Sequence, residues 1–106
     1  MAVGDIYTGE ACYPLDITET VAATGVPEPL AASKTLFQSA TLVGNNAART
    51  ANTSTAYLGS VSVQDIPIAP GEAVNLVAPE GKKMDLAKWY LRVGTNGDGV
   101  RGQYVI

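Results

Sequence analysis

The chain of 106 residues contains no histidine and a single cysteine, Cys12. Without histidine, the usual Ser-His and Cys-His catalytic pairs and the histidine-containing zinc sites are excluded. A lone cysteine cannot form an internal disulfide, so we expect Cys12 to act as a small apolar side chain, with an intermolecular bridge as the alternative. We therefore expect no metal and no cofactor.

Motifs for phosphate binding and acid–base catalysis are also scarce. The chain has no Gly-Lys-Ser/Thr loop, and its glycine-rich stretch at 94–99 precedes a predicted strand instead of a helix. Carboxylate pairs remain formally possible, but the acidic residues considered lie beside turns, where capping and solubility explain them. These residues are Asp5, Asp16, Glu19, Asp65 and Asp85. We expect a protein that is not an enzyme.

Long apolar runs and dense basic clusters are absent as well. No run approaches the roughly 18 apolar residues that a membrane helix needs, and the N-terminus lacks the pattern of a secretory signal. Of the seven basic residues, only Lys82 and Lys83 are adjacent. We therefore expect a cytosolic origin and neither a membrane nor a nucleic acid as partner.

Charge is unevenly distributed along the chain. Residues 1–33 hold five acidic side chains and no Lys or Arg, whereas residues 34–106 hold all seven basic side chains against five acidic ones. Two interpretations remain open: a solvated acidic segment, or an arm that meets a basic surface on a partner or on the next subunit.

Short β-rich runs separated by Gly, Pro and Asn dominate the rest of the sequence. They predict an all-β fold, a single small antiparallel β-sandwich or jelly-roll-like barrel with an extended N-terminal arm. We assign residues 1–33 to the arm, with a possible short strand, and 34–106 to the sandwich. The predicted strands are 16–24, 34–44, 56–63, 73–77, 88–94 and 100–106.

Two turns are well marked. Pro70 and Gly71 fit the central positions of a type II turn at 69–72, which predicts that the runs on either side are antiparallel neighbours. Asn96 and Gly97 favour a type I′ hairpin between the last two strands. A calcium loop competes at the same place, but Asp98 is its only carboxylate.

Alternation of side chains predicts which faces are buried. In 34–44 the apolar residues fall on both faces, as in a strand covered on two sides or one that carries a bulge. Trp89 is the predicted centre of the core because of its size. The residues expected to face the core are Tyr57, Val61 and Val63, then Trp89, Leu91 and Val93, and finally Val100, Tyr104 and Ile106.

Two further motifs lie in predicted connections. Asn52 begins a glycosylation sequon inside the polar loop 45–54, and we treat that match as chance. Asp85 can cap a single helical turn over 84–87 that leads into the strand at 88–94.

Several short motifs along 34–106 are similar to those of one protein family. They are Thr41-Leu42-Val43-Gly44, Ala56-Tyr57-Leu58-Gly59, the stretch from Ile66 to Glu72, Asp85-Leu86-Ala87-Lys88-Trp89-Tyr90-Leu91 and Gly97-Asp98-Gly99-Val100. Their succession resembles small β-sandwich proteins of tailed bacteriophage virions, such as decoration (cement) proteins, head-fibre bases and tail modules. The resemblance implies a structural, commonly trimeric, jelly-roll-like domain where capsid subunits meet.

The expected function is therefore that of a capsid decoration protein on the outer surface of the phage head, assembled in the host cytoplasm. Its expected partners are the major capsid protein and further copies of itself, as a trimer. The alternatives are a head-fibre or tail receptor-recognition module and a non-viral carbohydrate-binding or adhesion module. A receptor-recognition module would carry exposed aromatic residues clustered in a loop, whereas the loop 45–54 has none. The expected partner-binding anchors are Ile6, Tyr7, Tyr13 and Leu15.

Overall fold

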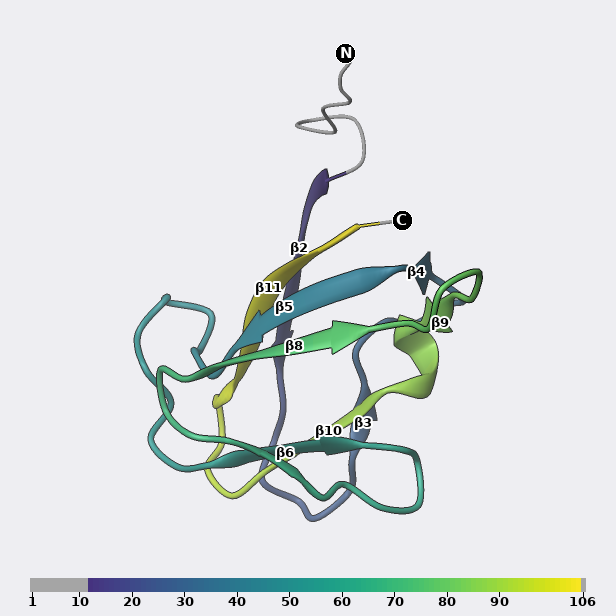
Figure 1. Cartoon of the computed structure of the whole chain (residues 1–106). Coiled ribbons are helices and arrows are strands. Elements are labelled where there is room, and N and C mark those ends of the chain that lie inside the picture. Colours follow the sequence, from purple (N-terminus) through teal and green to yellow (C-terminus); the bar gives the residue numbers. More distant parts are fainter. Residues whose placement is uncertain (1–11, 106) are drawn as a thin grey trace.

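The computed structural model describes the backbone of residues 12–105 and the side chains of residues 17–105. Two four-stranded antiparallel sheets pack face to face as a sandwich (Figure 1). The predicted all-β class and the sandwich architecture are confirmed. We call the two layers the β11 sheet and the β10 sheet, after a central strand of each.

The β11 sheet has the strand order β2, β11, β5, β8, with bounds Cys12–Thr20, Gly99–Val105, Ser39–Val43 and Ala73–Val77. The β10 sheet has the order β3, β10, β6, β7, with bounds Glu28–Pro29, Tyr90–Val93, Ala56–Gly59 and Ile66–Ile68. A two-stranded ribbon of β4, Leu36–Phe37, and β9, Met84–Asp85, closes one end, followed by the 3₁₀ helix η1, Leu86–Lys88.

The core lies between the two sheets, and its centre is not Trp89. The largest fully buried side chains are Phe37, Leu42, Leu58, Ile68, Leu91, Val21 and Val100. Trp89 is half-buried and packs against the edge of this core, because it ends η1 one residue before β10 begins. Leu91 and Val93 are buried as predicted, and so are Val100 and Tyr104, whereas Ile106 lies outside the described residues.

The predicted core face of 56–63 is wrong. Strand β6 ends at Gly59, and Leu58 is fully buried, whereas Tyr57 is half-buried beneath the Arg92 guanidinium, 4.6 Å from its ring centre. Val61 and Val63 lie in the following loop and are 59% and 52% exposed. Alternation in β6 puts Leu58 toward the core and Tyr57 on the other face, and the strand ends before it reaches Val61 and Val63.

The turn at 69–72 forms as predicted but does not make a hairpin. Gly71 has φ +77°, and the Glu72 amide donates to the Ala69 carbonyl at 2.9 Å. The strands on either side belong to different sheets, since β7 pairs with β6 and β8 pairs with β5. The turn therefore carries the chain from one layer of the sandwich to the other.

The second predicted hairpin is also a crossover between layers. Gly97 has φ +88° and the Asp98 amide donates to the Thr95 carbonyl at 3.2 Å, but Asn96 does not have the positive φ of a type I′ turn. Strand β10 pairs with β3 and β6, whereas β11 pairs with β2 and β5. The two strands are consecutive in sequence but lie in opposite sheets.

The described part of the predicted arm is built into the sandwich. Strand β2 pairs with β11 from Cys12 onward, and β3 pairs with β10. Ile17, Val21 and Leu30 are buried in the common core. The strand predicted at 16–24 therefore begins earlier and ends at Thr20.

The predicted strand 34–44 is divided in two. Strands β4 and β5 are separated by a bend at Gln38, whose amide donates to the Val105 carbonyl at 2.6 Å and whose side-chain nitrogen donates to the Ala78 carbonyl at 3.0 Å. The bend explains how Phe37 and Leu42 are both buried although they are five positions apart, an odd spacing.

The four edge strands differ in how they are protected. Strands β3 and β7 each contain a proline, Pro29 and Pro67, which lacks the N–H that another strand would need. Edge strand β8 has the sequence Ala-Val-Asn-Leu-Val, with neither proline nor charge. Hydrogen bonds from Gly44 to Glu72 and from Ala78 to Gln38 bracket its ladder with β5. By alternation, the N–H and C=O groups of positions 73, 75 and 77 therefore face outward.

Candidate partner-binding site

The predicted anchors divide between described and undescribed parts of the chain. Ile6 and Tyr7 lie outside the described residues. Tyr13 and Leu15 lie in β2, with Tyr13 opposite Tyr104 of β11, but their side chains are also outside the described set. The prediction that these four residues bind a partner therefore stays a prediction.

A buried polar cluster joins the loop before β6 to the turn before β11. We call it the Asp98 cluster, after a carboxyl group that is 2% exposed. One Asp98 oxygen accepts from the Thr53 amide at 2.9 Å, and the other accepts from the Ser54 amide at 2.9 Å and from the Ser54 hydroxyl at 3.1 Å. The Ser54 hydroxyl also lies 3.1 Å from that of Thr95. The cluster closes one end of the sandwich.

Asn52 completes this closure. Its Nδ2 donates to the Gly99 carbonyl at 2.7 Å, and its Oδ1 accepts from the Gly99 amide at 3.0 Å. Because Asn52 is only 4% exposed and both of its side-chain polar atoms are bonded, it is a poor acceptor for a glycan. Asn52 of the sequon therefore holds the loop 45–54 against the start of β11.

The Asp98 cluster is not arranged as a cation site. Both carboxyl oxygens already accept N–H donors, which would point positive charge at a bound cation. Among residues 12–105, no group of three or more His, Cys, Asp or Glu side chains is placed to hold a metal. The competing calcium-loop interpretation gains no support from this geometry.

A second feature is a groove of about 320 Å³, which we call the Trp89 groove. It is lined by Gly59, Ser60, Met84, Asp85, Lys88 and Trp89, and its surface is mostly apolar. Met84 and Trp89 are both half-buried against the core. The groove therefore exposes part of two large apolar side chains.

Local hydrogen bonds fix the wall of this groove. Oδ1 of Asp85 accepts from the Ala87 amide and from the Thr35 amide, both at 2.9 Å, which confirms the predicted cap. Leu86 is buried and anchors the turn, and the Trp89 amide donates to the Leu86 carbonyl at 3.3 Å. The cap and the anchor hold Trp89 at the margin of the core.

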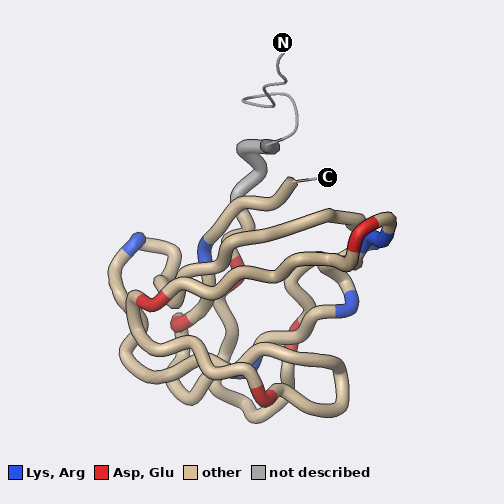
Figure 2. Tube along the Cα trace, in the orientation of Figure 1, with Lys and Arg blue, Asp and Glu red and all other residues tan. Residues whose placement is uncertain are grey.

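All four lysines of the chain lie near the groove. Lys88 lines it, and Lys82 and Lys83 immediately precede β9. Hydrogen bonds from the Thr35 and Ala87 amides lower the pKa of Asp85, and the positive charges of Lys88 and Lys34 add to the effect. Figure 2 shows blue and red segments together at the end of the sandwich where Figure 1 labels β4 and β9.

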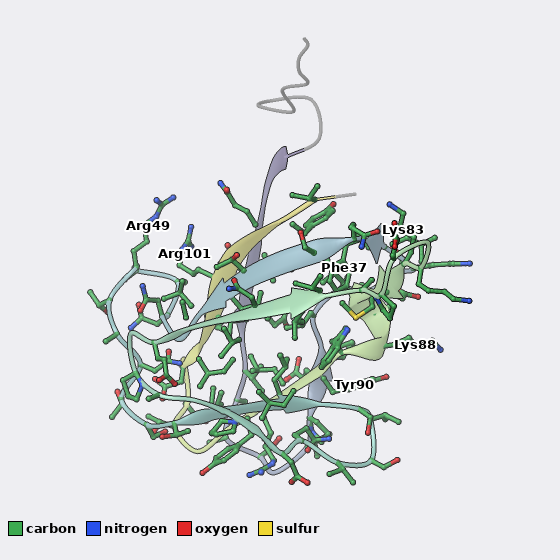
Figure 3. All side chains as sticks on the ribbon, in the orientation of Figure 1. Phe37, Arg49, Lys83, Lys88, Tyr90 and Arg101 are labelled. Carbon is green, nitrogen blue, oxygen red and sulfur yellow. The ribbon has the colours of Figure 1, made fainter. Side chains whose placement is uncertain are left out.

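Two arginines, Arg49 and Arg101, lie away from the lysines (Figure 3). Figure 3 shows Arg49 and Arg101 at the end of the sandwich opposite to Lys83 and Lys88. Arg49 is exposed in the loop 45–54 and has φ +67°. It offers a basic surface residue for comparison that is remote from the groove.

The sequence does not reveal the Asp98 cluster or the Trp89 groove, for identifiable reasons. Lys34 is far from Lys82 along the chain, so only the pairing of β4 with β9 brings the lysines together. The alternating pattern of 88–94 predicts a strand position for Trp89, although the cap by Asp85 implies a helical turn close to it. The burial of Asp98 had no signal in the sequence beyond its position beside a turn.

Comparison of the chain with protein-family models, with curated proteins and with solved structures finds no match. Within the described part of the chain, no helix has the length and apolar character needed to span a membrane.

Proposed function

We propose that this chain is a structural virion protein, a capsid decoration protein that binds the outer surface of a bacteriophage head and stabilises contacts between coat subunits. The observation that supports the proposal best is the contrast between its polar and apolar features. The polar groups of the Asp98 cluster hold loops together, whereas none of the described residues pairs with the outer edge of β8, and the Trp89 groove exposes apolar side chains; protein contacts use surfaces of both kinds.

The proposed partners are the major capsid protein and further copies of the same chain, as a trimer. Ile6, Tyr7, Tyr13 and Leu15 supply the anchors, and the acidic side chains of the N-terminal segment supply charge attraction to a basic surface. Screening by salt weakens such attraction. We expect binding to undecorated particles to fall as the salt concentration rises.

Counting copies in purified particles tests the proposal directly. Virions produced from a genome that carries this sequence are analysed by quantitative mass spectrometry and by cryo-electron microscopy. A decoration protein is expected in hundreds of copies spread over the head. Absence of the protein from the particle, or its confinement to the interior of the head, would contradict the proposal.

A receptor-recognition module of a head fibre or tail is the second candidate, and the Trp89 groove is the observation that favours it. A half-exposed indole beside polar Asp85 and Lys88 provides an apolar face with polar neighbours, which suits a sugar ring or a peptide. Such a module is expected in a handful of copies at one site on the particle, so the same count separates the two functions.

A further inference from the structure

The Trp89 groove combines an apolar lining with a basic surround. Met84 and Trp89 provide the apolar surface of its lining. Lysines lie around the groove, and the carboxyl group in its lining, Asp85, already accepts hydrogen bonds from two backbone amides. A ligand that fits this site carries a large apolar side chain next to negative charge.

The chain itself contains a segment with this chemistry. Residues 1–11, Met-Ala-Val-Gly-Asp-Ile-Tyr-Thr-Gly-Glu-Ala, include two acidic side chains and no basic one. Asp5 directly precedes Ile6 and Tyr7, so a carboxylate stands beside two large apolar groups. We propose that residues 1–11 of a second copy bind in the Trp89 groove, with Ile6 or Tyr7 in the apolar space and Asp5 and Glu10 near the lysines.

The size of the site and the reach of the segment agree with this assignment. A groove of about 320 Å³ lies at the lower end of pockets that hold small ligands, which suits one or two side chains. Eleven residues span up to about 36 Å when extended. That length is comparable to the diameter of a small domain, so the segment can reach an adjacent molecule.

The path of the chain at Cys12 favours a second copy over the segment's own groove. Strand β2 starts at Cys12 in the β11 sheet, beside Val105, and its N-terminal end is directed away from the body of the sandwich (Figure 1). The groove lies at the β4–β9 ribbon, beside the end of β6 and η1, and not along the direction in which β2 leaves the sandwich (Figure 1). When each copy gives its segment to the next, the contact is head-to-tail, and a rotation of one third of a turn between copies closes it into a trimer.

Reversing the charges on the segment and on the groove tests the contact in the isolated, full-length protein. One variant carries Asp5→Lys and Glu10→Lys, and another carries Lys82→Glu and Lys83→Glu at two exposed positions. Each variant is expected to weaken self-association about tenfold, because it loses two exposed charge pairs. The variant with all four substitutions restores opposite charges across the contact and is expected to regain most of the lost affinity. Arg49→Glu is the matched control and is expected to leave association unchanged.

Two readouts are followed over a concentration series. Sedimentation velocity reports the oligomer, and the emission of Trp89, the sole tryptophan, reports occupancy of the groove. The two are expected to change together. The proposal is overturned if the protein is monomeric at every concentration, or if neither double variant changes its self-association. Trp89 emission that depends on Asp5 and Glu10 but not on concentration also overturns it, since that result places the segment in its own groove.

These measurements need no capsid. Failure of the segment exchange therefore leaves the decoration function to be judged by the particle count alone, and failure of that function leaves the segment exchange intact.

Discussion

The Asp98 cluster and the Trp89 groove lie in different loops of one sandwich and use their side chains in opposite ways. In the cluster, a carboxyl and an amide that would suit a functional site are buried and fully occupied by loop atoms. In the groove, an aromatic residue that would suit a core centre remains half-exposed. The difference shows that the burial of a side chain and its hydrogen-bond partners, more than its residue type, distinguish a structural residue from one that can bind a ligand.

The largest expected effect comes from comparing Phe37 with Trp89. Phe37 is fully buried, so Phe37→Ala is expected to lower the free energy of unfolding by about 3–5 kcal/mol. Trp89→Ala removes a half-buried ring and is expected to cost about 1–2 kcal/mol. Urea denaturation measures both. An equal or larger loss of unfolding free energy for Trp89→Ala would show that Trp89 belongs to the core and would contradict the groove as a binding surface.

An intermediate effect is expected when the Asp98 cluster is broken. Asp98→Ala leaves the Thr53 and Ser54 amides without their acceptor and is expected to cost about 2–4 kcal/mol. Asp65→Ala removes a carboxyl group at an exposed position and is expected to change stability by less than about 0.5 kcal/mol. Thermal melting of the two variants measures the difference. Similar melting temperatures would show that the loops close without the cluster.

The smallest expected effect concerns Glu19 of β2. Burial raises the pKa of Glu19 above its usual 4.5, and the charge of Glu28 raises it further. The folded protein then holds this proton more tightly than the unfolded chain, so the contribution of Glu19 to stability falls as the pH rises from about 4.5 through the raised pKa.

Glu19→Gln removes this pH-dependent loss. The variant is expected to gain less than about 1 kcal/mol over the parent at pH 7, because solvent screens the site, and to gain nothing at pH 3. Glu80→Gln makes the same change at an exposed loop position and controls for the altered net charge. Stability curves against pH check the sign, and a gain confined to low pH would contradict it.

Local patterns predicted local structure well in this chain. The type II turn at Gly71, the cap at Asp85 and the burial of Leu91 and Val93 each depend on a few adjacent residues. Which strands are neighbours depends on contacts between distant segments, and a turn signal does not say whether the chain returns to the same sheet or crosses to the other. Both predicted hairpins were wrong for that reason.

The candidate site could be predicted only in part. The acidic character of the N-terminal segment and the adjacency of Lys82 and Lys83 are visible in the sequence. The approach of Lys34 and the exposure of Trp89 require the pairing of β4 with β9 and the end of η1, which no periodicity encodes.

The outer edge of β8 determines how fast its individual backbone amide protons exchange with solvent. Amides at positions 74 and 76 are shared with β5, so they exchange with solvent only when the strand detaches. Amides at 73, 75 and 77 face outward and exchange nearly as freely as in an open chain. Five consecutive residues thus alternate between fast and slow exchange, and the disappearance of the fast set in an assembled particle would identify β8 as a strand that had gained a neighbour.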